Sequence, residues 1–397
     1  ESEVIEDIDI GGPTMLRAAA KNFAYTAVVT SPESYDAVLE ELRSADSRLS
    51  LATRESLAAE AFHVTARYDT AVARWFAEKR EDFPPLMVGA YEKVTDLPYG
   101  ENPHQRAAYY AEVGSRRHLL SMVRQLHGRE LSYNNLLDLD AARALVAEFP
   151  EPACAIVKHK NPCGCAVGEG TQEAYERAFA CDPLSAFVVV IALNRPVDRT
   201  TAQQLHEQFV EVLVAPGYED GALELLSQKP DTRVLYDEER RHRPGRERAV
   251  RQVEGGLLVQ DRDLVEDRTE MEVVTGRPPG EEEWAALHFA WRVCRHVKSN
   301  AIVLARYGAT AGIGAGQMSR VDSVRLAIDK SRLESLQGTA LASDAFFPFA
   351  DGPEIAIAAG VTAIIQPGGS KRDSEVVEVA DRAGVAMVFT NRRHFRH

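Results

Sequence analysis

Three side chains that could perform acid–base chemistry stand together where an apolar run ends: Lys158, His159 and Lys160. Imidazole titrates near neutral pH and a neighbouring cation lowers its proton affinity, so His159 could act as a general base beside the fixed charge of Lys158. A solvated basic turn is the alternative, and the more common one, because most charged clusters lie at protein surfaces. These residues alone leave the choice open.

Two further stretches could bind a ligand. Glycines at 312, 314 and 316 precede Arg320 and a helical pattern, which would gather backbone N–H groups and a guanidinium around an anion. Their G-x-G-x-G spacing does not match the dinucleotide fingerprint. Phe346, two more phenylalanines and Asp351 could stack on and hydrogen-bond a flat heterocycle, although a turn packed into the core explains them equally well.

A cluster of Cys154, His159, Cys163 and Cys165 raises the question of a metal site. Zinc deaminases carry H-x-E followed by P-C-x-x-C, whereas here no Glu stands two residues after His159 and the proline precedes C-x-C. No nucleophile elbow surrounds a Ser or Cys. We therefore predict no metal and no covalent nucleophile.

The elements that must position these residues alternate between strands and helices. Continuous apolar runs predict buried strands, and apolar positions that recur on one helical face predict helices. The predicted strands are 25–29, 153–157, 188–193, 210–215, 301–306, 361–366 and 385–390, and the predicted helices are 13–21, one that opens at 31, 51–79, 136–149, 172–180, 281–296, 321–331, 354–359 and 375–383. This alternation indicates an α/β protein.

Turn-forming residues and charge mark the divisions of the chain. The stretch 82–85 contains two prolines and indicates a domain boundary, and the mixed-charge stretch 238–251 indicates an exposed connection. We predict domains at 1–90, 91–255 and 256–397.

Composition excludes several classes of protein. The 397 residues carry a formal charge of -14, which argues against nucleic-acid binding, because duplex affinity comes mainly from Lys and Arg on phosphates. The longest apolar run, 186–193, is too short to span a membrane. Five cysteines do not make a secreted disulfide framework, and the acidic first residues do not resemble a signal peptide, so we expect a cytoplasmic protein.

Eight motifs, in order along the chain, resemble one family: YGENPHQ, KHKNPCG, DPLSAF, VKSNAIV, GAGQMSR, SDAFFPFAD, QPGGS and RHFRH. It is the family of bifunctional purine biosynthesis proteins, which join an IMP cyclohydrolase domain to an aminoimidazole carboxamide ribonucleotide (AICAR) formyltransferase domain. The resemblance implies formyl transfer from 10-formyltetrahydrofolate to the 5-amino group of AICAR. It also implies a methylglyoxal-synthase-like cyclohydrolase remnant, then two zinc-free cytidine-deaminase-like α/β halves, in a homodimer with active sites at the subunit interface.

The resemblance also assigns roles to single residues. His159 would take the proton of the attacking amine, Lys158 would stabilise the charge of the tetrahedral intermediate, and Asn300 would contact the reacting groups. Several side chains match AICAR-binding positions: Tyr99, Glu211, Arg320, Phe346 and Arg393. Others match folate contacts or lie beside them: Val321, Asp351, Ser370 and Lys371. Asp9 and Lys21 match cyclohydrolase residues.

Two positions depart from the family. Pro98 replaces an arginine before the Tyr-Gly of the first motif, and Val188 replaces a glycine after S-x-F, where a branched side chain would crowd the ligand. Either change could weaken substrate binding, which leaves a catalytically impaired nucleotide- or folate-binding homologue as the rival interpretation. The front of the cyclohydrolase domain is not in this sequence, so we expect little or no inosinate formation from formyl-AICAR.

Overall fold

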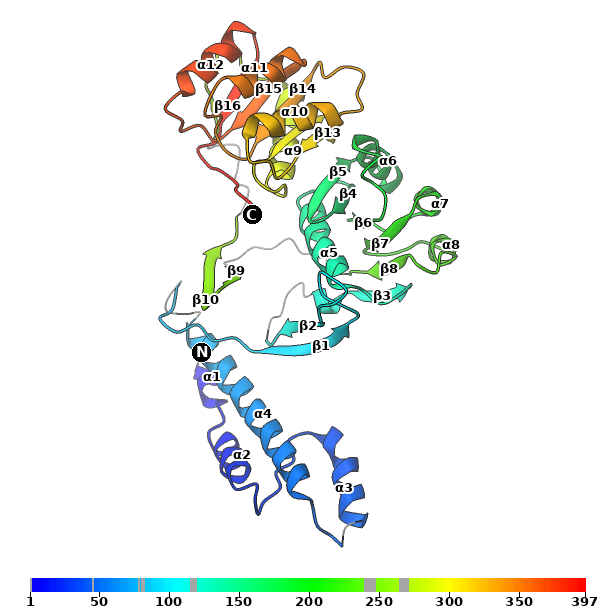
Figure 1. Ribbon diagram of the computed structural model, residues 1–397, viewed down its shortest axis with the longest axis vertical. Helices are drawn as coiled ribbons and strands as arrows, with labels where there is room; N and C mark the ends of the chain where they lie inside the picture. The colour runs from blue at the N-terminus through cyan, green and yellow to red at the C-terminus, as the bar shows by residue number, and fades with distance from the viewer. Residues whose placement is uncertain are drawn as a thin grey trace. The chain divides into compact units, whose positions relative to one another are not determined.

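The computed structural model describes residues 2–44, 46–77, 79, 83–114, 120–238, 248–263 and 271–397. The chain divides into two compact units. Unit 1 comprises Glu1–Thr95 and Tyr109–Leu119, and unit 2 comprises Asp96–Ala108 and Leu120–His397 (Figure 1). The predicted domain limits at 90 and 255 stay predictions.

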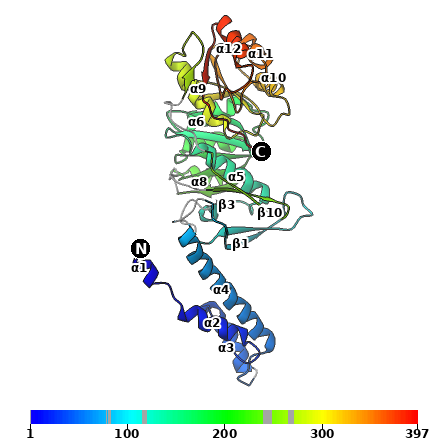
Figure 2. The same cartoon turned by 90° about the vertical axis from the view of Figure 1, so that its left-hand side faces the viewer.

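Unit 1 is largely helical. Its helices are α1 (Ser2–Glu6), α2 (Gly11–Lys21), the 3-10 helix η1 (Pro32–Ser34), α3 (Tyr35–Ser44) and α4 (Leu51–Ala77). Helix α2 runs beside α4, and Ala20 packs with Ala58 and Ala61 because small side chains let the two helices approach (Figure 2). The hairpin of β1 (Tyr91–Leu97) and β2 (Ala107–Glu112) begins in this unit.

The predicted strand at 25–29 is wrong. Asn22 instead closes a turn, since its carbonyl accepts the backbone N–H groups of Tyr25 and Thr26 at 2.9 and 3.0 Å, and irregular backbone follows. A single extended segment needs a neighbouring strand for its backbone groups, and none of the described residues pairs with this one.

Unit 2 is built on one mixed sheet, to which the described residues contribute twelve strands in the order β11-β16-β15-β14-β12-β13-β5-β4-β6-β7-β8-β3. Their bounds are β3 (Arg124–His127), β4 (Ala153–Lys158), β5 (Asn161–Val167), β6 (Val189–Leu193), β7 (Val210–Ala215), β8 (Arg233–Tyr236), β11 (Glu272–Val273), β12 (Ile302–Arg306), β13 (Ala309–Gly314), β14 (Thr339–Ser343), β15 (Val361–Gln366) and β16 (Ala386–Phe389). The α/β class predicted from the sequence is confirmed.

The strand order contains an internal repeat. From the centre outward, β5-β4-β6-β7-β8-β3 is matched by β13-β12-β14-β15-β16-β11. In each half an antiparallel hairpin lies at the centre, a second antiparallel pairing comes next, and two parallel pairings follow. The helices repeat too: α5 (Tyr133–Val146), α6 (Thr171–Cys181), α7 (Arg199–Glu207) and α8 (Ala222–Leu226) correspond to α9 (Glu281–Cys294), α10 (Arg320–Lys330), α11 (Asp351–Ala358) and α12 (Asp373–Arg382).

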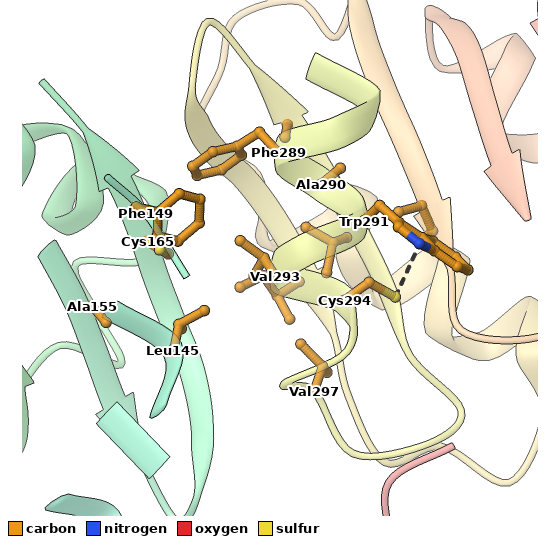
Figure 3. Close-up of a cluster of buried hydrophobic side chains, with 14 of the residues drawn as sticks. Leu145, Phe149, Ala155, Cys165, Phe289, Ala290, Trp291, Val293, Cys294 and Val297 are labelled. Atoms are coloured by element: carbon orange, nitrogen blue, oxygen red, sulfur yellow. Dashed lines mark hydrogen bonds between the residues drawn. The ribbon is translucent and has the colours of Figure 1, made fainter. Parts of the chain in front are cut away.

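Alternating side chains of each strand enter different cores. On β4, Ala155 and Val157 pack in the cluster that holds residues of α5 and α9, whereas Cys154 and Ile156 pack with residues of α6 and α7. The first cluster crosses the middle of the sheet, because the rings of Phe149 and Phe289 lie 5.2 Å apart (Figure 3). Strands covered on both faces explain why apolar runs predicted this sheet well.

One predicted connection is partly wrong. Residues 239–247 of the stretch 238–251 lie outside the described residues, but Arg248–Val253 forms β9, which pairs with β10 (Gly256–Asp261) in a separate two-stranded hairpin. Polar residues interrupt the apolar ones along β9, and most of its side chains are exposed, so it carries no apolar run to predict it. The predicted boundary after residue 255 falls in the turn of this hairpin.

Candidate active site

The Lys-His motif occupies the turn that joins β4 to β5. His159 and Lys160 have φ of 53° and 64°, the left-handed pair that a two-residue hairpin turn requires. Asp138 of α5 fixes this turn, because its Oδ2 accepts the His159 N–H at 3.0 Å and its Oδ1 accepts the Lys160 N–H at 2.6 Å. The His159 side chain is exposed.

Helix α5 owes its start to the sequence Ser-Tyr-Asn-Asn. The Ser132 hydroxyl accepts the Asn135 N–H at 3.2 Å, and the Asn135 side chain accepts the Ser132 N–H at 3.0 Å, which is a capping box. The cap sets the register of the helix and therefore the position of Asp138 one turn further on.

Lys158, the last residue of β4, is held from the DPLSAF loop. Its Nζ donates to the Phe187 carbonyl at 2.7 Å. The loop is braced in turn by Asp182, whose carboxylate accepts from the Ser185 backbone N–H at 3.1 Å and from Lys330 Nζ at 2.8 Å. The ammonium of Lys158 is thus held at the DPLSAF loop, and it has two further N–H donors besides the one that this contact uses.

A side-chain contact joins this turn to the second half of the sheet. Asn161 Oδ1 accepts the Lys298 N–H at 2.9 Å. The Lys298 carbonyl accepts the Gly316 N–H at 2.8 Å, and the Gln317 carbonyl accepts the Asn300 N–H at 3.1 Å. The motifs KHKN, VKSN and GAGQ therefore meet at the centre of unit 2, although about 150 residues separate the first from the others.

A cavity of about 420 Å³ opens beside these loops, at the start of α10. Its lining includes six of the residues predicted from the sequence: Asn300, Arg320, Val321, Phe346, Asp351 and Arg393. They come from four separate segments of the second half, so the fold assembles a set that the sequence leaves scattered.

Arg320 and Asn300 are hydrogen-bonded to each other at the wall of the cavity. Arg320 is 8% exposed, and its Nη2 donates to Asn300 Oδ1 at 2.7 Å. Asn300 Nδ2 donates to the carbonyls of Gln317 and Met318 at 3.0 and 3.1 Å, which fixes the amide orientation. A buried guanidinium held in this way is a rigid anion-binding group.

The remaining predicted residues of unit 2 do not line this cavity. Ser370 and Lys371 belong to the loop before α12, and the next residue, Arg372, lies over the ring of Phe349, a lining residue, at 4.9 Å. The loop therefore borders the cavity without forming its wall.

Tyr99 and Glu211 lie apart from the cavity as well. Tyr99 follows β1 in a loop that Asn134 of α5 holds, through a 3.2 Å hydrogen bond from its side chain to the Glu101 carbonyl. Glu211 on β7 lies 3.7 Å from Arg233 on β8, which neutralises part of its charge.

The two cyclohydrolase positions lie in unit 1. Asp9 Oδ1 accepts the Gly12 N–H at 3.0 Å at the start of α2, and Lys21 is the last residue of the same helix and exposed. Asp9 therefore accepts one of the backbone N–H groups that the first turn of a helix leaves without a partner inside the helix.

Sequence reasoning missed two residues that organise the site: Asp138, which holds the hairpin turn, and Asp344, which pairs with Arg320. Both act on residues more than 20 positions away in the chain, so no local pattern marks them. The only signal was that Asp344 belongs to the aromatic-rich loop motif.

The cysteines are poor ligands and poor nucleophiles. Burial raises the pKa of the Cys163 and Cys181 thiols to about 12, and it raises the pKa of Cys165 well above the ordinary value of a thiol, so none of the three is a thiolate at neutral pH. In the described part of the chain no group of three or more His, Cys, Asp or Glu side chains could hold a metal ion. Nor does any helix among those residues have the length and apolarity to cross a membrane.

The fold and the site define a class: an α/β protein whose cavity, lined by arginines and phenylalanines, suits an anionic ligand with a flat ring. The family described as AICARFT/IMPCHase bienzyme matches residues 19–330. The bifunctional purine biosynthesis protein PurH of Anoxybacillus flavithermus is 50% identical over 401 residues, which cover 100% of this chain and 77% of that protein.

Other relatives agree. The PurH proteins of Cereibacter sphaeroides and Bacillus cereus are 51% and 48% identical over 409 and 398 residues, again covering 77% of each relative. The chain belongs to the AICARFT/IMPCHase bienzyme family. The resemblance in the motifs is confirmed, and with it membership of an enzyme family of purine biosynthesis with AICAR formyltransferase and IMP cyclohydrolase activities.

Proposed function

We propose that this chain transfers the formyl group of 10-formyltetrahydrofolate to the 5-amino group of AICAR, giving formyl-AICAR and tetrahydrofolate. One observation carries the proposal: the second-half cavity gathers Asn300, Arg320, Phe346 and Arg393, and the Lys158–His159 turn is hydrogen-bonded to the same loops through Asn161. A base, a cation and an anion site in one region are what this reaction needs.

The cavity suits the nucleotide. Its volume of about 420 Å³ lies in the range of small-molecule sites. Arg320 and Arg393 can pair with the phosphate, and Phe346, at 38% exposure, offers a ring face to the imidazole. Tyr99 and Glu211 would contribute contacts from the first half.

The chemistry follows from the two turn residues. His159 accepts a proton from the amine of AICAR as the nitrogen attacks the formyl carbon, and Lys158 donates a hydrogen bond to the oxygen that becomes negative. The imidazolium then returns the proton to N10 of the folate as the N10–carbon bond breaks. The bond formed is N–C to AICAR, the bond broken is C–N10, and no redox partner is needed.

The folate would lie where Val321 and Asp351 line the cavity and where the loop of Ser370 and Lys371 borders it. The Asp351 carboxylate can accept N–H groups of the pterin, and Lys371, which is exposed, can meet the glutamate tail. We propose no resident metal for this chemistry, since the formyl donor already carries an activated carbon.

We further propose a cytoplasmic homodimer with its active sites at the subunit interface, and no nucleic-acid or membrane partner. The exposed rings of Phe187 and Phe209, 5.4 Å apart, lie next to the Phe187 carbonyl that holds Lys158, and a second copy of the chain would cover them. Sedimentation velocity tests this, because a monomer at micromolar concentration would contradict it.

The deciding experiment follows tetrahydrofolate formation spectroscopically with AICAR as acceptor. We expect turnover by this chain and a loss of roughly 10²-fold or more in kcat for His159→Ala, since a positioned base contributes that much. His63→Ala, at an exposed position on α4, is the matched control and should not change kcat. AICAR binding without turnover by the unaltered chain would favour the impaired homologue instead.

A further inference from the structure

Asp344 is a fully buried carboxylate at the end of β14, with 0% exposure. Burial of a charge is costly unless the charge is paired and hydrogen-bonded. Asp344 Oδ1 accepts from Arg320 Nη1 and, at 3.1 Å, from the Ala301 N–H, and its Oδ2 accepts from the Ser299 hydroxyl. Arg320 Nη1 also donates to Ser343 Oγ at 2.8 Å.

The internal repeat supplies a second copy of this position. Asn194 follows β6 as Asp344 follows β14, and the neighbouring pairs Cys154–Leu193 and Ile302–Ser343 have the same register. Asn194 Oδ1 accepts the Ala153 N–H at 2.8 Å, which is the contact that Asp344 makes with Ala301.

The backbone contacts at these two positions agree as well. The Asn194 N–H donates to the Ala153 carbonyl at 3.3 Å, and the Asp344 N–H donates to the Ala301 carbonyl at 3.2 Å. An amide side chain therefore suffices for the fold at this point, and the negative charge of Asp344 needs another explanation.

The two side chains differ in their other contacts. Asn194 Nδ2 donates to the backbone carbonyls of Phe149 and Glu151, both at 2.8 Å, so these contacts of Asn194 are structural. Asp344 instead forms an ion pair with Arg320, and Arg320 donates a hydrogen bond to Asn300. The negative charge of Asp344 therefore bears on two residues of the cavity wall.

We propose that Asp344 is a positioning residue for AICAR recognition, which acts by fixing the guanidinium of Arg320 and, through it, the amide of Asn300. This inference rests on the proposed function. Of the five N–H donors of an arginine, three are committed to Ser343, Asp344 and Asn300, and the described residues provide no partner for the others. Because these three contacts fix the guanidinium, its remaining N–H groups point in a fixed direction in which the nucleotide can bind.

The test is Asp344→Asn, with Asn194→Asp as the matched control in the other half. We expect Asp344→Asn to raise the KM for AICAR roughly 10-fold or more, because a charge-assisted hydrogen bond to Arg320 is lost, and to change the KM for 10-formyltetrahydrofolate by less than about twofold. Asn194→Asp, whether or not it lowers the melting temperature, should leave the KM for AICAR unchanged.

A double-mutant cycle with Arg320→Gln separates positioning from a general loss of stability. If Asp344 acts through Arg320, adding Asp344→Asn to Arg320→Gln should not raise the KM for AICAR further. Additive effects, an unchanged KM, or failure of Asp344→Asn to fold would each overturn the inference, the last because the charge would then belong to the fold.

Calorimetric titration with AICAR keeps this inference distinct from the proposed function. A chain that binds AICAR without turnover would refute the formyl transfer, while the effect of Asp344→Asn on the dissociation constant would still be measurable. No AICAR binding by the unaltered chain would overturn both.

Discussion

At the scale of single residues, Val188 is the residue whose backbone least suits its side chain. Its φ is 56°, in the left-handed region, where a β-branched residue is an outlier. The resemblance in the sequence implies a glycine at this position, and the φ of Val188 gives a physical reason for one, because glycine adopts this conformation without strain. The residue before Val188, Phe187, supplies the carbonyl that accepts from Lys158 Nζ, so the strained residue adjoins a contact of Lys158.

We therefore expect Val188→Gly to stabilise the chain. Relief of a left-handed β-branched residue is worth about 1–2 kcal/mol, from which the greater chain entropy of glycine subtracts about 0.5–1 kcal/mol. Urea unfolding should show a net gain of about 1 kcal/mol, and the KM for AICAR should fall or stay constant. Tyr307→Gly, in the turn between β12 and β13 with φ of 53°, is the control at another left-handed position: it should gain stability without changing KM. Destabilisation by Val188→Gly would show that its side-chain packing outweighs the strain.

Residue types and motifs predicted the members of the site better than their arrangement. Arg320, Phe346 and Arg393 were expected to bind one ligand, and they line one cavity. Asp138 and Asp344 were missed because each contacts a residue that is distant in the sequence. A single acidic residue in a helix or a loop forms no sequence pattern from which such a contact could be predicted. The folate and nucleotide roles of the single residues stay predictions.

At the scale of elements, α5 supports the hairpin turn that carries His159. Asp138 is the one contact through which this helix fixes both left-handed amides of the turn between β4 and β5. Left-handed residues other than glycine persist only where their surroundings hold them. The conformation of the hairpin turn therefore depends on a side chain of α5.

We expect Asp138→Ala to lower kcat roughly 10-fold or more, because the loss of two charge-assisted hydrogen bonds frees the turn that aims His159. The KM for 10-formyltetrahydrofolate should change little. Asp140→Ala, two residues further along α5 and exposed, is the control for removal of an acidic side chain. Equal losses in both variants would indicate a general effect on the helix and contradict a role in the turn.

The elements that the sequence predicted correctly are those whose burial leaves a pattern. Strands β4, β6 and β7 are nearly all buried and appear as apolar runs. The hairpin strands β9 and β1 are mostly exposed and carry charges, so their pairing depends on a local turn that hydrophobicity does not reveal. The failed strand at 25–29 shows the converse: apolar residues alone do not make a strand without a partner.

At the scale of the whole molecule, the two halves of unit 2 share a buried polar joint beneath the site. His296, at the end of α9, lies 3.3 Å from Glu148, which follows α5, and its carbonyl accepts from Arg396 of the C-terminal tail at 3.1 Å. Arg295 also pairs with Glu148. The tail that carries Arg393 to the cavity is thereby tied to both halves, so the integrity of this joint bears on the anion site.

Burial lowers the pKa of His296 from 6.5 to about 4, and the neighbouring Arg295 lowers it too, while Glu148 opposes them. In the unfolded chain His296 becomes protonated as the pH falls below 6.5, whereas in the folded chain it stays neutral down to about pH 4. The free energy of unfolding must therefore decrease as the pH drops from 6.5 to about 4. The loss from this one group should be about 2 kcal/mol between pH 7 and pH 5. Urea unfolding of His296→Gln at both pH values measures it: the variant should lose about 2 kcal/mol less than the unaltered chain. His63→Gln, exposed on α4, should follow the unaltered chain, and an unchanged pH response in His296→Gln would mean that other groups at the joint, Glu148 foremost, take up the proton in its place.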